Sequence, residues 1–271
     1  MLAKRAWFSA SRLPDRRHHR IYNEYHQLDH RPENLALPGV VFGERWVCPP
    51  ELQAACSYGD PRFEGMQYLV HYLLGDPLGP STQEWLDLSR TAFQEGRRPE
   101  TGLVERPFMG WFRPLKTYVN PRVRISAEAL PWRPVQGVFV NFVEIDPGAD
   151  QKAVHDELAR LEEERMPAAI GELDVAGVAV YVSDPDAESP FSTSLKDESF
   201  ATDPDLRVEL YFLDADPLQA SAALRDLVAT PDPDRSGADG APILRPLFAG
   251  PLAPIGPWQW SWFDGEAQDD R

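Results

Sequence analysis

The sequence predicts an α+β fold built from two similar halves, each with the element order β-α-β-β-α-β. Short apolar runs with the period of two that is typical of strands alternate with longer helical patterns along the 271-residue chain. An offset of 135 residues places Pro32 on Pro167 and Val40 on Val175, but few residues are identical, so the repeat depends on element order more than on residues. A proline-rich segment at residues 113–134 lies between them and is expected to connect them.

The first half contains four expected strands and two expected helices. Alternating apolar residues predict the strands, which cover residues 4–13, 40–47, 66–74 and 108–119. The first helix is expected at residues 15–30, with Pro32 as its limit, because a residue that precedes proline avoids the α conformation. The second helix is expected to begin at an N-cap, Ser81, and to end at Gly96.

The second half repeats this order of elements. Strands are expected at residues 135–145, 173–182, 206–213 and 257–263, the last because its three tryptophans alternate strictly with other residues. Helices are expected at residues 150–166 and 218–229. Two stretches rich in Asp, Ser and Pro, residues 183–205 and 230–242, are expected to be loops, and residues 264–271 a disordered tail.

These patterns predict two ferredoxin-like modules, in which two helices cover one face of an antiparallel sheet and leave the other face apolar. Residues 1–120 would form the first module, with the candidate site, and residues 135–263 the second, joined by a connector at 121–134. The two uncovered sheet faces of one chain can then pack against each other as a closed barrel-like body. The interior of such a body can hold a ligand cavity.

Charge is distributed unevenly between the halves. Residues 1–135 hold 18 Lys and Arg against 15 Asp and Glu, whereas residues 136–271 hold 9 against 28. So acidic a surface repels phosphate groups, and we expect binding neither to nucleic acid nor to an anionic membrane.

No apolar run has the length of a signal peptide core or a membrane span, which predicts a soluble, cytoplasmic protein. Two cysteines provide neither a disulfide framework nor a zinc-ligand set.

The candidate chemistry is concentrated on one predicted helix. Tyr22, His26 and His30 follow one another at intervals of four residues, which places their side chains on one helical face. Imidazole titrates near neutral pH, so His26 and His30 could serve as general base and general acid, with His30 suited to the acid role at the helix end. Asp29 or Glu33 could orient one of the rings, and Tyr22 could donate to an oxyanion.

Other interpretations of this histidine pair stay open. Two histidines at this spacing often simply cap and pack a helix end, and they are also a sound bidentate metal geometry. A metal would need a third ligand, for which Glu33 and His71 are the sequence candidates, although His71 in a strand is more typical of a hydrogen-bonded core histidine. A haem would need an axial histidine in a large apolar cavity, which no pattern here marks. The sequence therefore predicts no metal site and no cofactor.

The region around the pair resembles the dimeric α/β-barrel superfamily of ferredoxin-like proteins, and within it the EthD-like branch. The matching residues are Tyr22, Tyr25, His26, Asp29, His30, Pro32, Glu33, Pro38 and Gly39. The resemblance implies a tandem chain that closes its own barrel, with further pairing into a homodimer still feasible. It also implies an activity among isomerases, cyclases, dehydratases, decarboxylases, cofactor-free oxygenases and haem enzymes. The second half departs from the pattern, since Leu161, Glu164 and Arg165 replace His26, Asp29 and His30.

The function that these observations favour is that of a small-molecule enzyme of the lyase or isomerase type. His26 and His30 would carry out acid–base chemistry on an apolar, aromatic or polyketide-like carbonyl compound. Aromatic and basic side chains at strand positions would contact this substrate inside the barrel or under the helices, namely Trp7, Arg45, Trp46, Tyr68, Tyr72 and Trp111. A non-catalytic ligand-binding or interaction protein is the alternative, and a metal or haem enzyme is the third.

Overall fold

The computed structural model describes residues 3–98, 101–184, 205–231 and 240–264. The predicted acidic loop at 183–205 and the predicted tail at 264–271 fall almost entirely outside the described residues, as does much of the predicted loop at 230–242. Within the described part of the chain, no helix is long and apolar enough to cross a lipid bilayer.

The first half is a four-stranded antiparallel sheet with helices on one face. Its strands are β1 (Arg5–Arg12), β2 (Val40–Val47), β4 (Tyr68–Leu74) and β5 (Glu105–Val119), in the spatial order β2-β4-β1-β5. The first helical segment comprises η1 (Arg16–His18), α1 (His19–Tyr25), η2 (His26–His30) and α2 (Arg31–Ala36), and the second is α4 (Leu78–Gln94). The short elements α3 (Pro50–Gln53), β3 (Ser57–Tyr58) and η3 (Pro61–Phe63) lie between β2 and β4.

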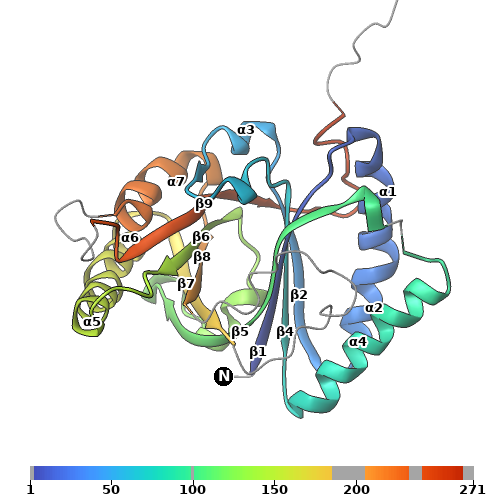
Figure 1. The fold of residues 1–271 in the computed structure, drawn as a ribbon, viewed down its shortest axis with the longest axis horizontal. Helices are drawn as coiled ribbons and strands as arrows, with labels where there is room; N and C mark the ends of the chain where they lie inside the picture. The colour runs from blue at the N-terminus through green and yellow to red at the C-terminus, as the bar shows by residue number, and fades with distance from the viewer. Residues whose placement is uncertain (1–2, 99–100, 185–204, 232–239, 265–271) are drawn as a thin grey trace, which may run out of the picture.

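The second half has the same strand arrangement. β6 (Gly137–Ile145), β7 (Val175–Ser183), β8 (Leu206–Leu213) and β9 (Leu244–Pro254) lie in the order β7-β8-β6-β9. Its helical segments are α5 (Gln151–Arg160), η7 (Leu161–Arg165) and α6 (Met166–Glu172), followed later by α7 (Pro217–Leu224) and η9 (Arg225–Ala229). Two 3-10 turns, η5 (Pro121–Val123) and η6 (Ala127–Trp132), connect the halves. Figure 1 shows the helices on the outer sides of the two sheets.

The two sheets join at both edges into a closed barrel within one chain, as the sequence predicts. One seam is long, because β5 pairs with β7 from Phe112 opposite Ser183 to Val119 opposite Gly177. The other seam is short: β2 and β9 pair only through Trp46 with Pro254 and Val47 with Ala253. β3 extends β9 on its free edge. The fold class inferred from the sequence is therefore confirmed.

The inner faces of the two sheets meet in a packed aromatic and aliphatic core. Phe8 of β1 contacts Phe112, Phe142 and Tyr181, with ring centroids between 5.1 and 6.5 Å apart. All four side chains are at most 3% exposed. The interior of the barrel, where the sequence allowed a ligand cavity, is filled at this level by side chains from both halves.

The prediction that Pro32 ends the first helix is wrong, because the helical segment continues to Ala36. Residues His26–His30 form a π-helical turn, in which the amide of Arg31 donates to the carbonyl of His26 five residues earlier. Pro32 has no backbone N–H to donate, and after this wider turn it does not interrupt an α-helical i→i−4 hydrogen bond. η7 places the same π turn before Pro167, so the aligned prolines of the two halves have the same structural role.

Two further element assignments are corrected by the structure. The final strand is β9, not residues 257–263, where Trp258 has a positive φ of 63° and residues 256–259 form a turn. The sequence pattern did not indicate β9, because this strand contains three prolines, and prolines are rare inside strands. One of them, Pro246, lies where the register between β9 and β6 shifts. Helix α4 begins at Leu78, and Ser81 bonds within its first turn to the carbonyl of Pro77 rather than capping it.

Candidate functional site

The candidate site lies on the outer face of the first sheet, beneath the helices. Successive residues of β1 alternate between the two faces, so Phe8 points into the barrel core while Trp7, Ser9 and Ser11 face the helices. Small polar residues at this helix–sheet interface leave room, and buried hydroxyls need partners. The site is therefore outside the barrel, in the layer between sheet and helices.

Strand register arranges this face into rows from apolar to polar. Trp7 lies opposite Tyr72 of β4 and Trp111 of β5, and their aromatic cluster is completed by Trp85 of α4, 5.6 Å from Trp7. The next row along β1 has Ser9 between Val70 and Met109, and the one after has Ser11 opposite Tyr68. The sheet face thus offers an aromatic end and a polar end.

Tyr22, His26 and His30 lie on one face of the first helical segment and point toward this sheet, as their spacing predicts. The ring centroid of His26 is 4.5 Å from that of Tyr22 and 5.1 Å from that of His30. The Tyr22 hydroxyl donates to Oγ of Ser11 at 3.2 Å, which fixes the helix over the polar end of the sheet. Tyr25 stacks on His30, and its hydroxyl lies 3.2 Å from His30 Nδ1.

A cavity of about 50 Å³ opens between these helical residues, the sheet and the end of α4. Its lining combines aromatic, hydroxyl, imidazole and guanidinium groups, from Trp7, Ser9, Ser11, Tyr22, His26, His30, Val70, Tyr72, Trp85, Ser89, Arg98, Arg106 and Met109. No acidic side chain lines it among the residues that the structure describes. The cavity is therefore positively charged and bordered by hydrogen-bonding groups on one side and rings on the other.

His26 is the buried imidazole of this cavity. It is 8% exposed, and its Nδ1 atom is fully buried without a hydrogen-bond partner in the described structure. Burial holds the pKa of His26 well below its usual range, and nearby charged and titratable groups lower it further, namely Arg45, His30, Arg106 and Arg98. The imidazole is consequently neutral at neutral pH, so one ring nitrogen carries a lone pair and the other a proton.

His30 does not have the environment that the sequence suggests for a general acid. The helical segment continues past it to Ala36, so His30 is not in the last turn and gains no cation stabilisation from a helix end. Burial lowers the pKa of His30 to about 3, and the surrounding guanidinium groups, first of all Arg98, add to this effect. His30 is therefore also neutral, and it bonds Tyr25 through Nδ1.

Arg98 and Arg106 supply two guanidinium groups to the cavity from different elements. Arg98 follows α4 and donates from Nη1 to Oγ of Ser89 at 3.1 Å. Arg106 is in β5, at the level where the pairing with β1 shifts between Ala10 and Arg12. Burial lowers the pKa of Arg106, and among the described residues it has neither a hydrogen-bond nor an ion-pair partner.

Arg45 is a third cation close to the site. It is 1% exposed and lies over the rings of Tyr22 and Tyr68, with its guanidinium carbon 5.1 and 5.4 Å from their centroids. Its Nη2 donates to Oδ1 of Asn23 at 3.0 Å, while Nε and Nη1 have no partner in the described structure. The sequence analysis expected Arg45 to contact the substrate, and the structure forms no ion pair to it within the described residues.

Asp29 and Glu33, expected to orient the imidazole rings, bind Arg97 instead. Both oxygens of Asp29 lie 2.6 and 2.7 Å from Arg97 Nη1, and Glu33 Oε2 lies 2.9 Å from the same atom. Neither carboxylate lines the cavity. This ion cluster connects the first helical segment with the segment after α4. The two carboxylates pair with the charge of Arg97 and form no hydrogen bond to His26 in the described structure.

The predicted aromatic contacts are divided between two faces of the sheet. Trp7 and Tyr72 line the cavity, whereas Trp111 packs behind Trp7, with ring centroids 4.7 Å apart. Tyr68 lies under the helix and hydrogen-bonds to His19 Nδ1 at 2.7 Å. Trp46 points to the other face, into the barrel core. Successive residues of a strand point to opposite faces of the sheet, so the position of each aromatic residue along its strand determines which face it occupies.

The described residues do not fit a metal ion or a haem at this site. They contain no group of three or more His, Cys, Asp or Glu side chains with ligand geometry. His71, one candidate third ligand, lies on the opposite sheet face, and Glu33 is engaged by Arg97. A cavity of about 50 Å³ is far below the roughly 300–1,000 Å³ of sites for larger ligands. A wider groove of about 510 Å³ beside β2 is lined by no histidine.

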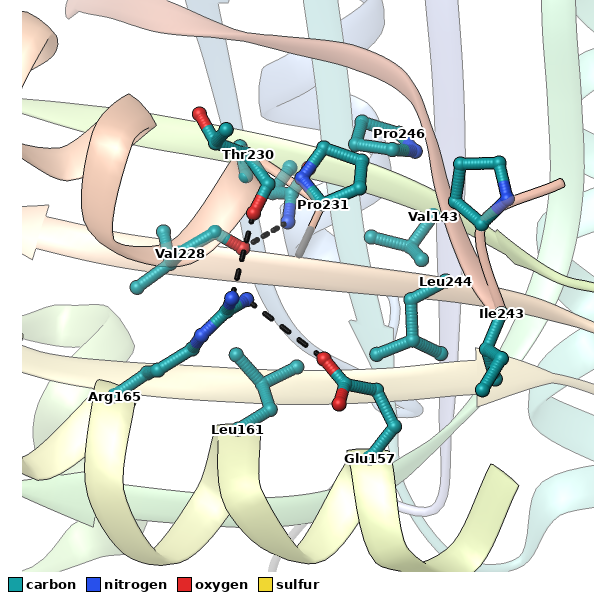
Figure 2. A pocket seen from close by; sticks show the side chains of 13 residues that line it. Val143, Glu157, Leu161, Arg165, Val228, Thr230, Pro231, Ile243, Leu244 and Pro246 are labelled. Carbon is teal, nitrogen blue, oxygen red and sulfur yellow. Dashed lines mark hydrogen bonds and ion pairs between the residues drawn. The ribbon is translucent and has the colours of Figure 1, made fainter. Parts of the chain in front are cut away.

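The second half has a smaller cavity at the corresponding helix–sheet layer. Figure 2 shows Arg165 and Glu157 pointing toward each other from one helical segment, with the Arg165 Nη2 atom 3.4 Å from the Thr230 carbonyl oxygen. Its volume of about 20 Å³ is enough for about one water molecule. The side chains at the positions of His26 and His30, Leu161 and Arg165, fill this space, so the two halves offer different chemistry.

Sequence reasoning missed five polar residues of the cavity: Ser9, Ser11, Ser89, Arg98 and Arg106. A signal for two of them was present, because Ser9 and Ser11 alternate with apolar residues in a strand whose two faces are both buried. Arg98 follows the Gly96 stop and Arg106 precedes Pro107, and neither context indicates burial. Only the tertiary arrangement brings these arginines to His26.

Comparison with known proteins supports the fold. No family model matches the sequence, and no curated protein matches it. Among solved structures, a putative chlorite dismutase superposes with a TM-score of 0.51 at 10% identity, covering 93% of this chain and 96% of the other. A putative monooxygenase from Fusobacterium nucleatum covers 94% of this chain and 97% of its own, with a TM-score of 0.48 at 8% identity. The chain thus shares the two-module, ferredoxin-like α/β-barrel fold of the putative chlorite dismutase.

Proposed function

We propose that the protein is a small-molecule enzyme in which the neutral imidazole of His26 removes a proton from a carbon next to a carbonyl group. The observation that supports this most directly is the buried Nδ1 atom of His26, which has no protein partner in the described structure and belongs to a residue that lines the cavity. A buried polar atom without a partner costs stability, so a ligand that supplies its partner is favoured.

The proton transfer requires no cofactor. In the tautomer with the proton on Nε2, His26 Nδ1 accepts the substrate proton, the C–H bond breaks, and its electron pair becomes an enolate. A guanidinium and a hydroxyl group of the cavity can stabilise the oxyanion, from Arg106 and from Ser11, whose hydroxyl accepts from Tyr22 and can donate to the substrate. The imidazolium then returns the proton to the other end of the enolate system, which completes an isomerisation.

The size of the cavity favours a compact carbonyl compound. An engineered cavity of about 150 Å³ holds benzene, and the cavity beside His26 has about 50 Å³. An aromatic or polyketide-like substrate would therefore require the rings of Trp7 or Trp85 to move. We propose an oxoacid-sized molecule as the substrate.

Hydrogen–deuterium exchange tests this function without knowledge of the product. Pyruvate, 2-oxobutanoate and acetoacetate are incubated with the protein in deuterium oxide, and label at the carbon next to the carbonyl is followed by NMR. The wild-type protein is expected to accelerate exchange over buffer, and His26→Gln to lose this acceleration while keeping its stability. His155→Gln, an exposed histidine on α5, is the matched control and should exchange like wild type. Equal exchange by His26→Gln and wild type would refute the assignment.

Ligand binding without turnover is the second candidate function. Lowered pKa values make both imidazoles weak bases in the empty site, which is unfavourable for proton abstraction. Saturable binding of a carbonyl acid with no exchange above buffer would favour this second function.

A further inference from the structure

Within the described part of the chain, the arginines around His26 have no carboxylate partner, whereas a buried arginine of the second half has two. In the second half, Arg207 is 1% exposed and lies between two acids. Its Nε is 2.8 Å from Glu209 Oε1, and its Nη1 is 3.0 Å from Glu162 Oε1. This network pairs the charge of an internal guanidinium with two carboxylates of the same half, although Nη2 of Arg207 has no hydrogen-bond partner in the described structure.

The described residues provide no such compensation at the cavity. Arg98 donates to a serine hydroxyl, Arg45 to an amide oxygen, and Arg106 to no group among the described residues. Asp29 and Glu33 are the nearby acids on the helix, and both bind Arg97 outside the cavity. Arg98 and Arg106 therefore line a small space in which the described residues place no anion, and Arg45 lies close by; this arrangement is destabilising unless a negative charge enters.

We propose that the cavity binds the carboxylate of a compact organic acid, held by the guanidinium groups of Arg98 and Arg106 beside His26. Guanidinium groups bind carboxylates through paired, charge-assisted hydrogen bonds. The inference names the substrate class of the function proposed above and rests on it for the chemistry, although binding can be measured without turnover.

The rest of the lining favours an organic acid over inorganic phosphate. Trp7, Val70 and Met109 give the cavity an apolar wall, which a carbon chain can contact and a phosphate ion cannot use. The serine hydroxyls of β1 can bind the carbonyl oxygen of the same molecule. The acid would thus lie with its carboxylate at the arginines and its carbon atoms against the sheet.

Anion binding would also change the basicity of His26. The rings of Tyr22, Tyr25 and His30 from the same helical segment contact the His26 ring. His30, together with Arg45 from β2, Arg106 from β5 and Arg98 after α4, lowers the pKa of His26. A carboxylate among the guanidinium groups offsets their repulsion of an imidazolium. The pKa of His26 therefore rises on binding, and the imidazole becomes a better base when substrate is present.

Thermal unfolding of the full chain, at constant ionic strength set with chloride, tests the proposal. Acetate, pyruvate and phosphate are titrated against wild type, Arg106→Gln, His26→Gln and Arg90→Gln, an exposed arginine of α4 that serves as control. Pyruvate is expected to raise the Tm of wild type and Arg90→Gln to saturation. Arg106→Gln should bind pyruvate at least tenfold more weakly, and its Tm without ligand should exceed that of wild type, because a half-buried cation that has no partner among the described residues is gone.

Each outcome bears on the proposal. No saturable effect of either carboxylate, equal pyruvate affinity in Arg106→Gln, or an effect of phosphate alone would overturn it. Retained pyruvate binding by His26→Gln, together with a pKa of His26 in wild type that rises with pyruvate in NMR titration, would support it. Saturable binding without deuterium exchange would refute the proposed enzymatic function and leave the carboxylate site standing.

Discussion

Replacement of His71 by leucine is expected to make the protein more resistant to acid. His71 is in the middle of β4 and points into the barrel core, where it stacks on Phe8 with ring centroids 4.6 Å apart. It is 0% exposed, and neither ring nitrogen has a hydrogen-bond partner in the described structure. The core position agrees with the sequence prediction, whereas the expected hydrogen bonds are absent.

The size of the effect follows from the lowered pKa. Burial lowers the pKa of His71 from 6.5 to about 3. Between these two values the unfolded chain binds a proton that the native protein does not, so the free energy of unfolding falls as the pH decreases. Between pH 7 and pH 5 the loss attributable to His71 is about 2 kcal/mol. At pH 7, His71→Leu removes two buried nitrogens that have no hydrogen-bond partner, which stabilises the protein, but it also removes the stacking on Phe8. The free energy of unfolding of His71→Leu should therefore exceed that of wild type by about 1 kcal/mol.

Urea unfolding at both pH values measures this prediction. The decrease in unfolding free energy from pH 7 to pH 5 should be about 2 kcal/mol smaller for His71→Leu than for wild type. Phe8→Leu perturbs the same stack without a titrating group, so it should lower stability by the same amount at both pH values. Equal pH dependence in His71→Leu and wild type would mean that the native protein accepts the proton at His71, and the reasoning would fail.

Two further substitutions test how the barrel and the site are held together. Gly177→Ala is expected to lower the unfolding free energy by about 2–4 kcal/mol in urea, because its Cβ would lie 2.4 Å from the Tyr118 carbonyl oxygen across the β5–β7 seam. Gly171→Ala, whose Cβ meets nothing within 4 Å in α6, should instead be neutral or stabilising, and a similar loss in both variants would argue against the seam. Asn23→Leu should cost about 3 kcal/mol by removing the hydrogen bond to buried Arg45. Adding Arg45→Met should restore part of this loss, and a purely additive double mutant would show that the two side chains are not coupled.

The fold was predictable because it depends on patterns that the chain repeats. Val40 and Val175 begin the second strand of each sheet, and the prolines before them follow a π turn in each half. The stripe of Tyr22, His26 and His30 was also predictable, since a helix brings residues four apart together whatever the tertiary context.

The electrostatics of the site could not be predicted. Asp29 and His26 are close in sequence, yet Arg97, 68 residues away from Asp29, determines what that carboxylate binds. Arg106 reaches the cavity only because β5 lies beside β1 with a register shift. The error at the C-terminal strand has a simpler cause: prolines in β9 obscured a real strand, while alternating tryptophans at 258–262 imitated one.

The closure of the barrel within one chain has a consequence for binding stoichiometry. In a barrel assembled from two identical subunits, every pocket occurs twice, and occupancy of one can influence the other. In this chain Leu161 and Arg165 occupy the positions that correspond to His26 and His30, and Arg165 and Arg207 of the second half already have carboxylate partners. Ligand should therefore bind with one molecule per chain, along a hyperbolic isotherm without cooperativity.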